Sequence, residues 1–197
     1  MPTRLSRAEQ VERNRELVLD AARRVFLERG YAGATVDTIA LEAGFSKGVV
    51  YSQFAGKPDL FLALLEQRIA ERAAENAQAA EGEAGVDGLR QLVLVNARHA
   101  QDTAWPRLMI EFRLVAARNP ELNRRYAHLH TRSLEQLGET IRKVLARRGL
   151  APVHSPRLLA ELIFALDTGY VLEQAAGTSR LEVDVLVDLV GRLVRPI

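Results

Sequence analysis

The chain has 197 residues, 48% of them hydrophobic, and a formal net charge of +2 at pH 7. This length and this apolar fraction are sufficient for one domain, or two small ones, with a buried core. The sequence contains no cysteine, which excludes disulfides, thiolate metal ligands and cysteine nucleophiles. Its small net charge means that any surface for nucleic acid must be a local one.

The N-terminal segment, residues 1–12, carries mixed charge. The arginines in and just after it are Arg4, Arg7, Arg13 and Arg15, and glutamates lie between them. Two interpretations stay open: a solvated, disordered tail, or an arm that follows the DNA backbone. The segment is no secretory signal, and no apolar run is long enough to span a bilayer, so we expect a cytoplasmic protein that does not enter a membrane.

Two short helices joined by a tight turn are expected between residues 35 and 54, after a first helix at 15–31. Thr35 and Ser46 each precede a helical pattern, where a hydroxyl can accept a backbone N–H. Gly44 follows the first of the two, where a left-handed residue is usually required. Apolar stripes at helical spacing are formed by Val36, Ile39, Ala40 and Ala43, and by Val50 and Phe54. The pattern predicts a helix-turn-helix; the alternative is a turn that only packs a small three-helix bundle.

The outward face of the second short helix is small and polar. Opposite the apolar stripe it carries Gly48, Val49, Ser52 and Gln53. Such a face can approach base edges in a major groove, where glutamine can pair with adenine, serine with most bases, and valine with a thymine methyl. Lys47 opens the helix and can meet a phosphate. The face therefore favours DNA recognition over packing alone.

The sequence on both sides of this motif follows one long, strictly spaced pattern. It comprises the first helix Arg15-Glu-Leu-Val-Leu-Asp-Ala-Ala-Arg-Arg-Val-Phe-Leu-Glu-Arg-Gly-Tyr31, then Ala34-Thr-Val-Asp-Thr-Ile-Ala, then Ala43-Gly-Phe-Ser-Lys-Gly-Val-Val-Tyr-Ser-Gln-Phe54, and then Lys57 and Asp59-Leu60-Phe61. This pattern resembles the TetR family of bacterial transcriptional regulators. It covers about the first 60 residues. The remainder matches by length and helical layout.

The resemblance implies roles for the residues of the motif. Thr35, Lys47, Tyr51 and Lys57 are expected to contact phosphates or to position the helix, and Gly48, Val49, Ser52 and Gln53 to face bases. Ser46, at the start of the second helix, completes the candidate DNA-binding set. Family members often have aromatic and histidine residues where this chain has Ser52 and Gln53, so the operator sequence does not transfer.

The rest of the chain predicts an all-α fold of about nine helices and no strand. A helix-turn-helix domain at 1–56 is expected to precede a ligand-binding and dimerisation domain at 57–197. The expected later helices span 58–80, 89–101, 105–118, 121–148, 155–176 and 180–194, with a glycine-rich acidic loop at 81–88.

The last two helices are apolar on more than one side, which calls for a partner beyond their own core. The resemblance implies a four-helix bundle between two copies, and hence a homodimer whose recognition helices reach successive major grooves of a palindromic operator. The candidate dimerisation residues are Leu159, Leu162, Ile163, Leu186, Leu189, Val190 and Leu193. The alternative is burial of these helices in a larger monomeric core.

The middle helices are expected, from the resemblance, to enclose a pocket for a small hydrophobic effector. The candidate ligand-binding residues are Asn96, His99, Trp105, Met109, Phe112, Arg113, Tyr126, Phe164, Asp167 and Tyr170, and His128 is a further polar candidate. The alternative is that the aromatic residues fill the core and that each polar one satisfies a neighbour.

Enzyme and metal chemistry find little support in the sequence. His128 and His130 are two residues apart, which on a helix turns their rings away from a common ion. His99 and Asp102 have no nucleophile nearby, and no phosphate loop, nucleophile elbow or carboxylate pair is present. We therefore expect no cofactor, no metal and no catalysis. The sequence predicts a ligand-responsive DNA-binding regulator, a repressor by default; the alternatives are a helical adaptor that has lost DNA binding, or a small helical enzyme.

Overall fold

The computed structural model describes residues 6–101, 104–177 and 182–196, with the side chains of residues 99–101 and 183 outside that description. Within these ranges the chain forms nine helices and two short strands, and the predicted all-α fold class is confirmed. The elements are α1 (Arg7–Gly33), α2 (Val36–Ala43), α3 (Lys47–Tyr51), α4 (Lys57–Glu81), α5 (Gly85–Gln101), α6 (Ala104–Ala117), α7 (Pro120–Ala146), β1 (Leu150–Pro152), α8 (Pro156–Ala175), α9 (Val183–Gly191) and β2 (Val194–Pro196).

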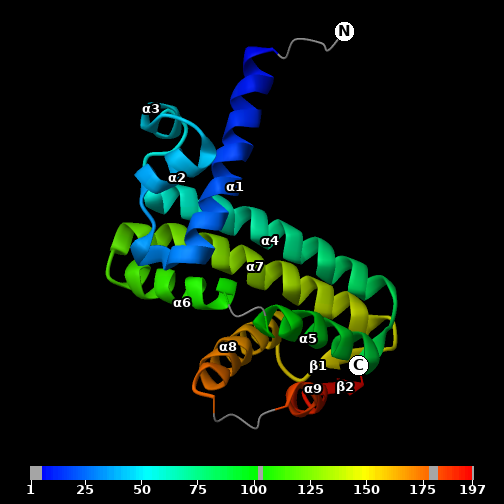
Figure 1. The fold of residues 1–197 in the computed structure, drawn as a ribbon. Coiled ribbons are helices and arrows are strands. Elements are labelled where there is room, and N and C mark those ends of the chain that lie inside the picture. Colours follow the sequence, from blue (N-terminus) through cyan, green and yellow to red (C-terminus); the bar gives the residue numbers. More distant parts are fainter. Residues whose placement is uncertain (1–5, 102–103, 178–181, 197) are drawn as a thin grey trace.

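The long helices α4 and α7 lie side by side across the middle of the molecule (Figure 1). The helix α1 leads from the N-terminal end to this pair, with α2 packed against it and α3 packed on α2. At the opposite end α8 packs on α5 and α7, and α9 packs on α5 and α8, next to the C-terminus. The helix-turn-helix and the C-terminal helices therefore occupy opposite ends, and α4 and α7 connect them.

The first helix begins earlier than predicted because a capping box stands in front of it. The Ser6 backbone N–H donates to the Glu9 carboxylate at 2.7 Å, and the Glu9 N–H donates to the Ser6 hydroxyl at 3.2 Å. The prediction of an unstructured arm is therefore wrong for residues 7–12, which are helical. Residues 1–5 lie outside the described residues.

The turn chemistry of the helix-turn-helix is confirmed at two of three positions. The hydroxyl of Thr35 accepts the Thr38 N–H at 3.1 Å and caps α2. Gly44 ends α2 in the left-handed conformation, at φ 71°. The prediction for Ser46 is wrong in one respect: it precedes α3 with an extended backbone, but its hydroxyl makes no capping hydrogen bond.

Two short strands were not predicted. Leu150–Pro152 and Val194–Pro196 pair antiparallel, with Ala151 opposite Arg195. Three-residue strands show no alternation in sequence, so this pair carries no signal of its own. The pairing also shortens the last helix, which ends at Gly191 instead of residue 194. Similarly, α5 begins at Gly85 and so occupies half of the expected loop.

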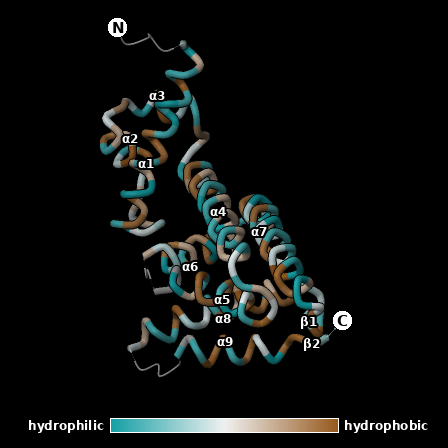
Figure 2. Tube along the Cα trace, turned by 90° about the vertical axis from the view of Figure 1, so that its right-hand side faces the viewer, coloured by the Kyte–Doolittle hydropathy of each residue, from teal (hydrophilic) through white to brown (hydrophobic). Residues whose placement is uncertain are grey.

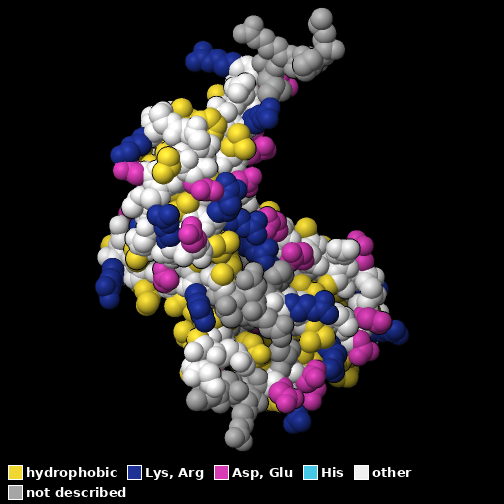
Figure 3. All heavy atoms as spheres, viewed as in Figure 1, with side chains coloured by type: hydrophobic (Ala, Val, Ile, Leu, Met, Phe, Trp, Pro, Cys, Tyr) yellow, Lys and Arg dark blue, Asp and Glu magenta, His cyan; other side chains and the backbone are white. Residues whose placement is uncertain are grey.

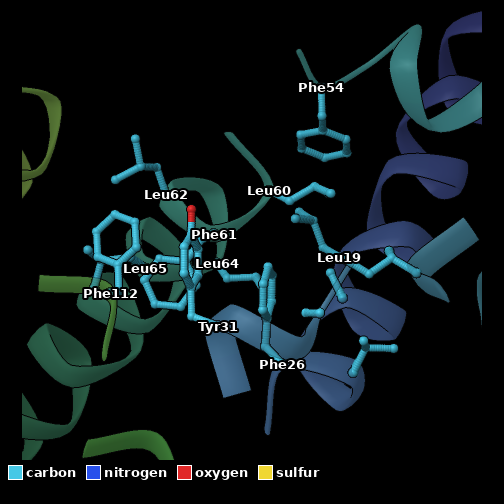
Figure 4. Packing of buried hydrophobic residues seen from close by; sticks show 14 of the residues in the cluster. Leu19, Phe26, Tyr31, Phe54, Leu60, Phe61, Leu62, Leu64, Leu65 and Phe112 are labelled. Atoms are coloured by element: carbon cyan, nitrogen blue, oxygen red, sulfur yellow. The ribbon is translucent and has the colours of Figure 1, made fainter. Parts of the chain in front are cut away.

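The core between the two halves is aromatic. Figure 4 shows Phe26 and Tyr31 of α1 facing Phe61 of α4, with Phe112 of α6 beside them. The rings of Phe61 and Phe112 stack at 4.2 Å, and Tyr31 meets Phe112 edge-on at 5.1 Å. Because α1 belongs to the helix-turn-helix unit, this cluster packs that unit directly against α4 and α6.

A second core lies at the other end, between α5, α7, α8 and α9. Figure 2 shows apolar and polar residues alternating along α4 and α7, as expected of helices buried on one side. No helix in the described ranges combines the length and the apolar character needed to cross a membrane.

Candidate DNA-binding surface and ligand cavity

Two buried apolar side chains pack the second helix of the motif, α3, against the rest of the helix-turn-helix. Val50 is fully buried and Phe54 is 4% exposed, and the guanidinium of Arg15 lies 4.4 Å from the Phe54 ring centroid. The Phe54 N–H donates to the Val50 carbonyl at 3.0 Å, so helical hydrogen bonding continues past the end of α3. These contacts determine which side of α3 is turned outward.

The outward side consists of small residues, a lysine and a tyrosine. Lys47, Gly48, Tyr51 and Ser52 are exposed, and Val49 is half-buried. The Lys47 ammonium forms an ion pair with Asp37 of α2 at 2.5 Å, and the Ser52 hydroxyl donates to the Val49 carbonyl at 2.8 Å. Figure 3 shows basic and acidic side chains intermingled over the face in view, in keeping with the small net charge. The described residues of the face in view therefore form no extended surface of a single charge sign.

The geometry of Gln53 departs from the prediction that it faces bases. Its Oε1 atom is buried and has no hydrogen-bond partner among the described residues. The side chain lines a groove shared with Leu62 of α4 and Arg132 of α7. Gln53 follows the end of α3 at Tyr51, and its N–H donates to the Val50 carbonyl three residues earlier at 3.1 Å, which is a tighter turn than the α-helix assumed from sequence. In this conformation the amide oxygen is turned toward the body of the protein.

Lys57 is held within the chain at the start of α4. Its ammonium donates to the Tyr31 carbonyl at 2.8 Å and to the Ala32 carbonyl at 3.4 Å, and it lies 4.6 Å from the Tyr31 ring centroid. Partial burial lowers the pKa of Lys57. These contacts support a positioning role, since they join the end of α1 to α4.

A cavity of about 190 Å³ lies between α4, α5, α6, α7 and α8. Seven of the ten candidate ligand-binding residues line it: Asn96, Trp105, Met109, Arg113, Tyr126, Phe164 and Asp167. Phe112 does not line it, because it is fully buried in the aromatic core. Tyr170 packs instead with Val171 and Leu186 under α9. The His99 side chain lies outside the described residues, and His128 faces the outer groove near Gln53.

The sequence interpretation missed several polar residues of the cavity wall. Arg68, Arg72 and Asn76 come from α4, and His130 and Gln136 from α7. Arg72 and Asn76 are four residues apart and follow the apolar positions Leu65 and Ile69 on one helix face. That spacing was the available signal: polar residues that continue an apolar stripe.

One end of the cavity holds a buried polar network. Arg72 donates to the Asn96 side-chain oxygen, while the Asn96 amide donates to Asn76 at 3.2 Å and to the Leu92 carbonyl at 2.7 Å. Burial lowers the pKa of Arg72 to about 10 against the opposing field of Asp167. Burial likewise raises the pKa of Asp167 to about 6, and the Arg72 charge opposes that rise. Arg72 of this network and Asp167 of α8 are thus two ionisable groups of opposite sign in the wall of one cavity.

Two family profiles match this chain. Residues 18–64 match the family described as bacterial regulatory proteins, tetR family, and residues 85–197 match the BetI-type transcriptional repressor C-terminal domain. The second match alone covers more than half of the chain. The protein belongs to the TetR family. It is accordingly a transcriptional regulator and not an enzyme.

Curated relatives of this TetR-family chain are named as transcriptional regulators, two of them matched over more than nine-tenths of both lengths. The HTH-type transcriptional repressor AcnR of Corynebacterium efficiens is 28% identical, over 92% of this chain and 93% of its own length. A Mycobacterium tuberculosis HTH-type transcriptional repressor is 30% identical over 92% of both chains. The transcriptional activator FasR of Mycolicibacterium smegmatis matches at 45% identity over 29% of this chain. The motif is thus shared by proteins named repressor and activator.

Solved TetR-like structures share the fold. FadR from Bacillus halodurans superposes with a TM-score of 0.71 at 22% identity, covering 97% of this chain and 96% of its own. FadR from Bacillus subtilis, solved in complex with stearoyl-CoA, gives a TM-score of 0.67 at 21% identity, with 90% and 96% covered. At these identities the likeness establishes the fold alone.

The candidate dimerisation residues of this TetR chain divide into two groups. Leu159, Ile163, Leu186 and Val190 are buried in the protomer itself, so the prediction that a partner covers them is wrong. Leu162 and Leu189 are 37% and 51% exposed, and Leu193 is half-buried. The helical periodicity was correct, but it could not distinguish the face toward the protomer core from the face toward solvent.

Proposed function

We propose that this TetR-family regulator is a repressor that binds a palindromic operator as a homodimer and leaves it when a small molecule fills the cavity. The observation that carries the proposal is that the same two helices contact both the cavity and the helix-turn-helix. The helices α4 and α6 line the cavity, and both also pack against α1 of the helix-turn-helix. A change in their positions at the cavity is therefore transmitted to the DNA-binding end.

The proposed DNA contact uses the outward side of α3. Gly48, Val49 and Ser52 would face base edges, while Lys47 and Tyr51 would meet phosphates on either side. Thr35, Ser46 and Lys57 would position the two helices rather than read sequence. Gln53 is left out of the base-reading set because its amide oxygen is buried.

The proposed dimer uses exposed apolar residues of α8 and α9. On α8 the exposed or small positions Leu158, Leu162, Ala165, Gly169 and Leu172 follow one another at spacings of four and three, which forms one continuous stripe. On α9, Val185 and Leu189 are 47% and 51% exposed. A two-fold pairing of these stripes makes a four-helix bundle and supplies two recognition helices for two half-sites.

Release follows from a population shift. A ligand that fills the cavity better in one arrangement of α4 and α6 favours that arrangement, and operator affinity falls by the ratio of its affinities for the two arrangements. The sign of regulation is proposed by analogy with the relatives named repressors. We also propose a cytoplasmic location, because the proposed partner is operator DNA.

Footprinting on the DNA around the protein's own gene tests the proposal. The expected result is a symmetric protected region with two half-sites whose centres are about 10 base pairs, or a multiple of that spacing, apart. Protection of one half-site by a monomer would reject the dimer, and absence of any sequence-dependent protection would favour the adaptor alternative.

A further inference from the structure

The charged residues of the cavity wall indicate what kind of molecule it accepts. We propose that the effector is a small carboxylate with a compact aromatic or apolar body, bound through Arg72. This inference rests on the proposed function, since it names the ligand class of the same regulatory cavity.

Positively charged side chains outnumber negative ones in the cavity wall. Among the described residues, three guanidinium groups line it, those of Arg68, Arg72 and Arg113, against one carboxylate, that of Asp167, while Glu75 acts on Arg72 from outside the lining. Arg68 is paired with Glu71 at 3.1 Å, and Arg113 donates to the Thr168 hydroxyl at 3.5 Å. A cationic ligand would meet this field unfavourably, whereas an anion is attracted by it.

Arg72 is the group that can hold such an anion. Its acceptor is the neutral Asn96 oxygen, and it forms no ion pair with any residue in the described ranges. A guanidinium has five N–H donors in a planar fork, which matches the two oxygens of a carboxylate. Asn96 is itself held by Asn76 and the Leu92 carbonyl, so the fork is oriented before any ligand arrives.

Asp167 complements the same ligand. It forms no hydrogen bond or ion pair within the part of the chain that the structure describes. Its raised pKa, about 6, means that an incoming anion readily shifts it to the neutral acid. In that form its O–H can donate to a ligand oxygen, and like-charge repulsion is removed.

The size and lining of the cavity define the body of the ligand. A volume of about 190 Å³ is close to the roughly 150 Å³ of an apolar cavity that holds benzene. The rings of Tyr126 and His130 stack at 5.6 Å, Phe164 lies 5.9 Å from His130, and Trp105 completes this wall. A single aromatic ring fits such a space, whereas a long acyl-CoA exceeds it.

The test uses Trp105 as a built-in reporter, because it is the only tryptophan of the chain and lines the cavity. Three probes of similar shape are titrated: 3-phenylpropionate, its neutral amide, and 3-phenylpropylamine. We expect the acid to change Trp105 fluorescence at a concentration roughly tenfold lower than the amide, and the amine to bind least.

Two variants assign the effect to Arg72. Arg72→Met should bring the acid to the affinity of the amide, and Arg72→Lys, which keeps the charge without the fork, should retain part of the preference. Arg142→Met is the matched control, because Arg142 lies on the outside of α7 and pairs with Glu139 at 2.7 Å. Circular dichroism establishes that each variant is folded.

The outcomes separate the ligand class from the proposed function. Equal or tighter binding of the amide or amine, an acid preference that survives in Arg72→Met, or binding of stearoyl-CoA but of none of the three probes would overturn the inference. Failure of all probes at millimolar concentration would also overturn it. Operator binding by the wild-type protein is measured separately, without any probe. Absence of operator binding there would reject the proposed function, whereas the probe titrations test only the ligand class.

Discussion

The backbone N–H of Tyr31 donates to the carboxylate of Glu111 at 2.8 Å, across 80 residues of sequence. Gly30, at φ 69°, interrupts α1 just before Tyr31 and leaves that N–H without a helical partner. Glu111 lies on α6, two residues from Met109 of the cavity wall. This hydrogen bond therefore joins the cavity helix to the DNA-binding unit.

Replacing Glu111 should weaken this connection. Glu111→Ala leaves the Tyr31 N–H unpaired, so we expect a loss of about 1–3 kcal/mol in the free energy of unfolding. The change in operator affinity on ligand binding should also become smaller. Urea unfolding and operator titrations with and without ligand measure both. Glu135→Ala, on the exposed side of α7, is the control; equal behaviour of the two variants would argue against a coupling role for Glu111.

The backbone at Gly30 should not tolerate a side chain. An alanine Cβ there would lie 2.7 Å from the Glu111 carboxylate, and the conformation at φ 69° and ψ 173° is one that L residues rarely adopt. We expect Gly30→Ala to lower the free energy of unfolding by about 1–3 kcal/mol. Gly33→Ala, where the nearest atom is 3.5 Å away, should be neutral or stabilising by up to about 1 kcal/mol. Similar unfolding midpoints for both variants would contradict this account.

Lys47 and Gln53 should behave differently on DNA. Lys47→Ala should weaken operator and random DNA alike and reduce the salt slope by about 1, since its ammonium would meet a phosphate. Gln53→Met should leave operator affinity within a few-fold and raise the free energy of unfolding by about 1 kcal/mol, because it removes a buried oxygen without a partner. Anisotropy titrations at several salt concentrations decide this; a sequence-dependent loss in Gln53→Met would return Gln53 to the base-reading set.

The ionisation of Asp167 should make stability depend on pH. Its pKa is about 6 in the folded chain and 3.8 without the fold. Between these values the folded state binds more protons, so stability decreases as pH rises through this window. Asp167→Asn should therefore exceed the wild type in unfolding free energy at pH 7 by on the order of 2–3 kcal/mol, and by less near pH 4. Urea unfolding at both pH values checks this, with exposed Asp188→Asn as control. A gap between Asp167→Asn and the wild type that is the same at both pH values would show that Asp167 is not the titrating group.

The exposed stripe of α8 and α9 should hold the dimer together. The double substitution Leu162→Glu and Leu189→Glu places charges on that surface and should give monomers in light scattering at micromolar concentration. Leu114→Glu is the matched control, because Leu114 is exposed on α6, away from the stripe. Dimers of unchanged stability in the double variant would place the interface elsewhere.

Local chemistry explains which parts of the fold could be predicted from sequence. Thr35 and Gly44 act on their own neighbours, so the start and end of α2 were predictable. The start of α1 was equally predictable, because serine followed three residues later by glutamate is the signature of a capping box. The prediction of a helix start near Arg15 did not use this signature at Ser6 and Glu9. The strand at Leu150 depends on a partner more than forty residues away, and no local pattern reveals it.

The cavity was predictable in its aromatic wall but not in its polar end. Trp105 and Phe112 have the same helical character in sequence, and only the packing of α1 and α4 sends Phe112 into the core. In sequence, Arg72 cannot be distinguished from a solvent-facing arginine. Its role becomes apparent only from the fold, which places Asn96 of α5 and Asp167 of α8 near it. The orientation of Gln53 could not be predicted, because it depends on where α3 ends.

The most direct test of the account is a linkage measurement on the intact protein at one salt concentration. Operator affinity is determined by anisotropy with and without a ligand that occupies the cavity, as reported by Trp105 fluorescence. We expect the ligand to lower operator affinity by roughly 5–150-fold and operator to lower ligand affinity by the same factor. A ligand that saturates Trp105 and leaves operator affinity unchanged would contradict it.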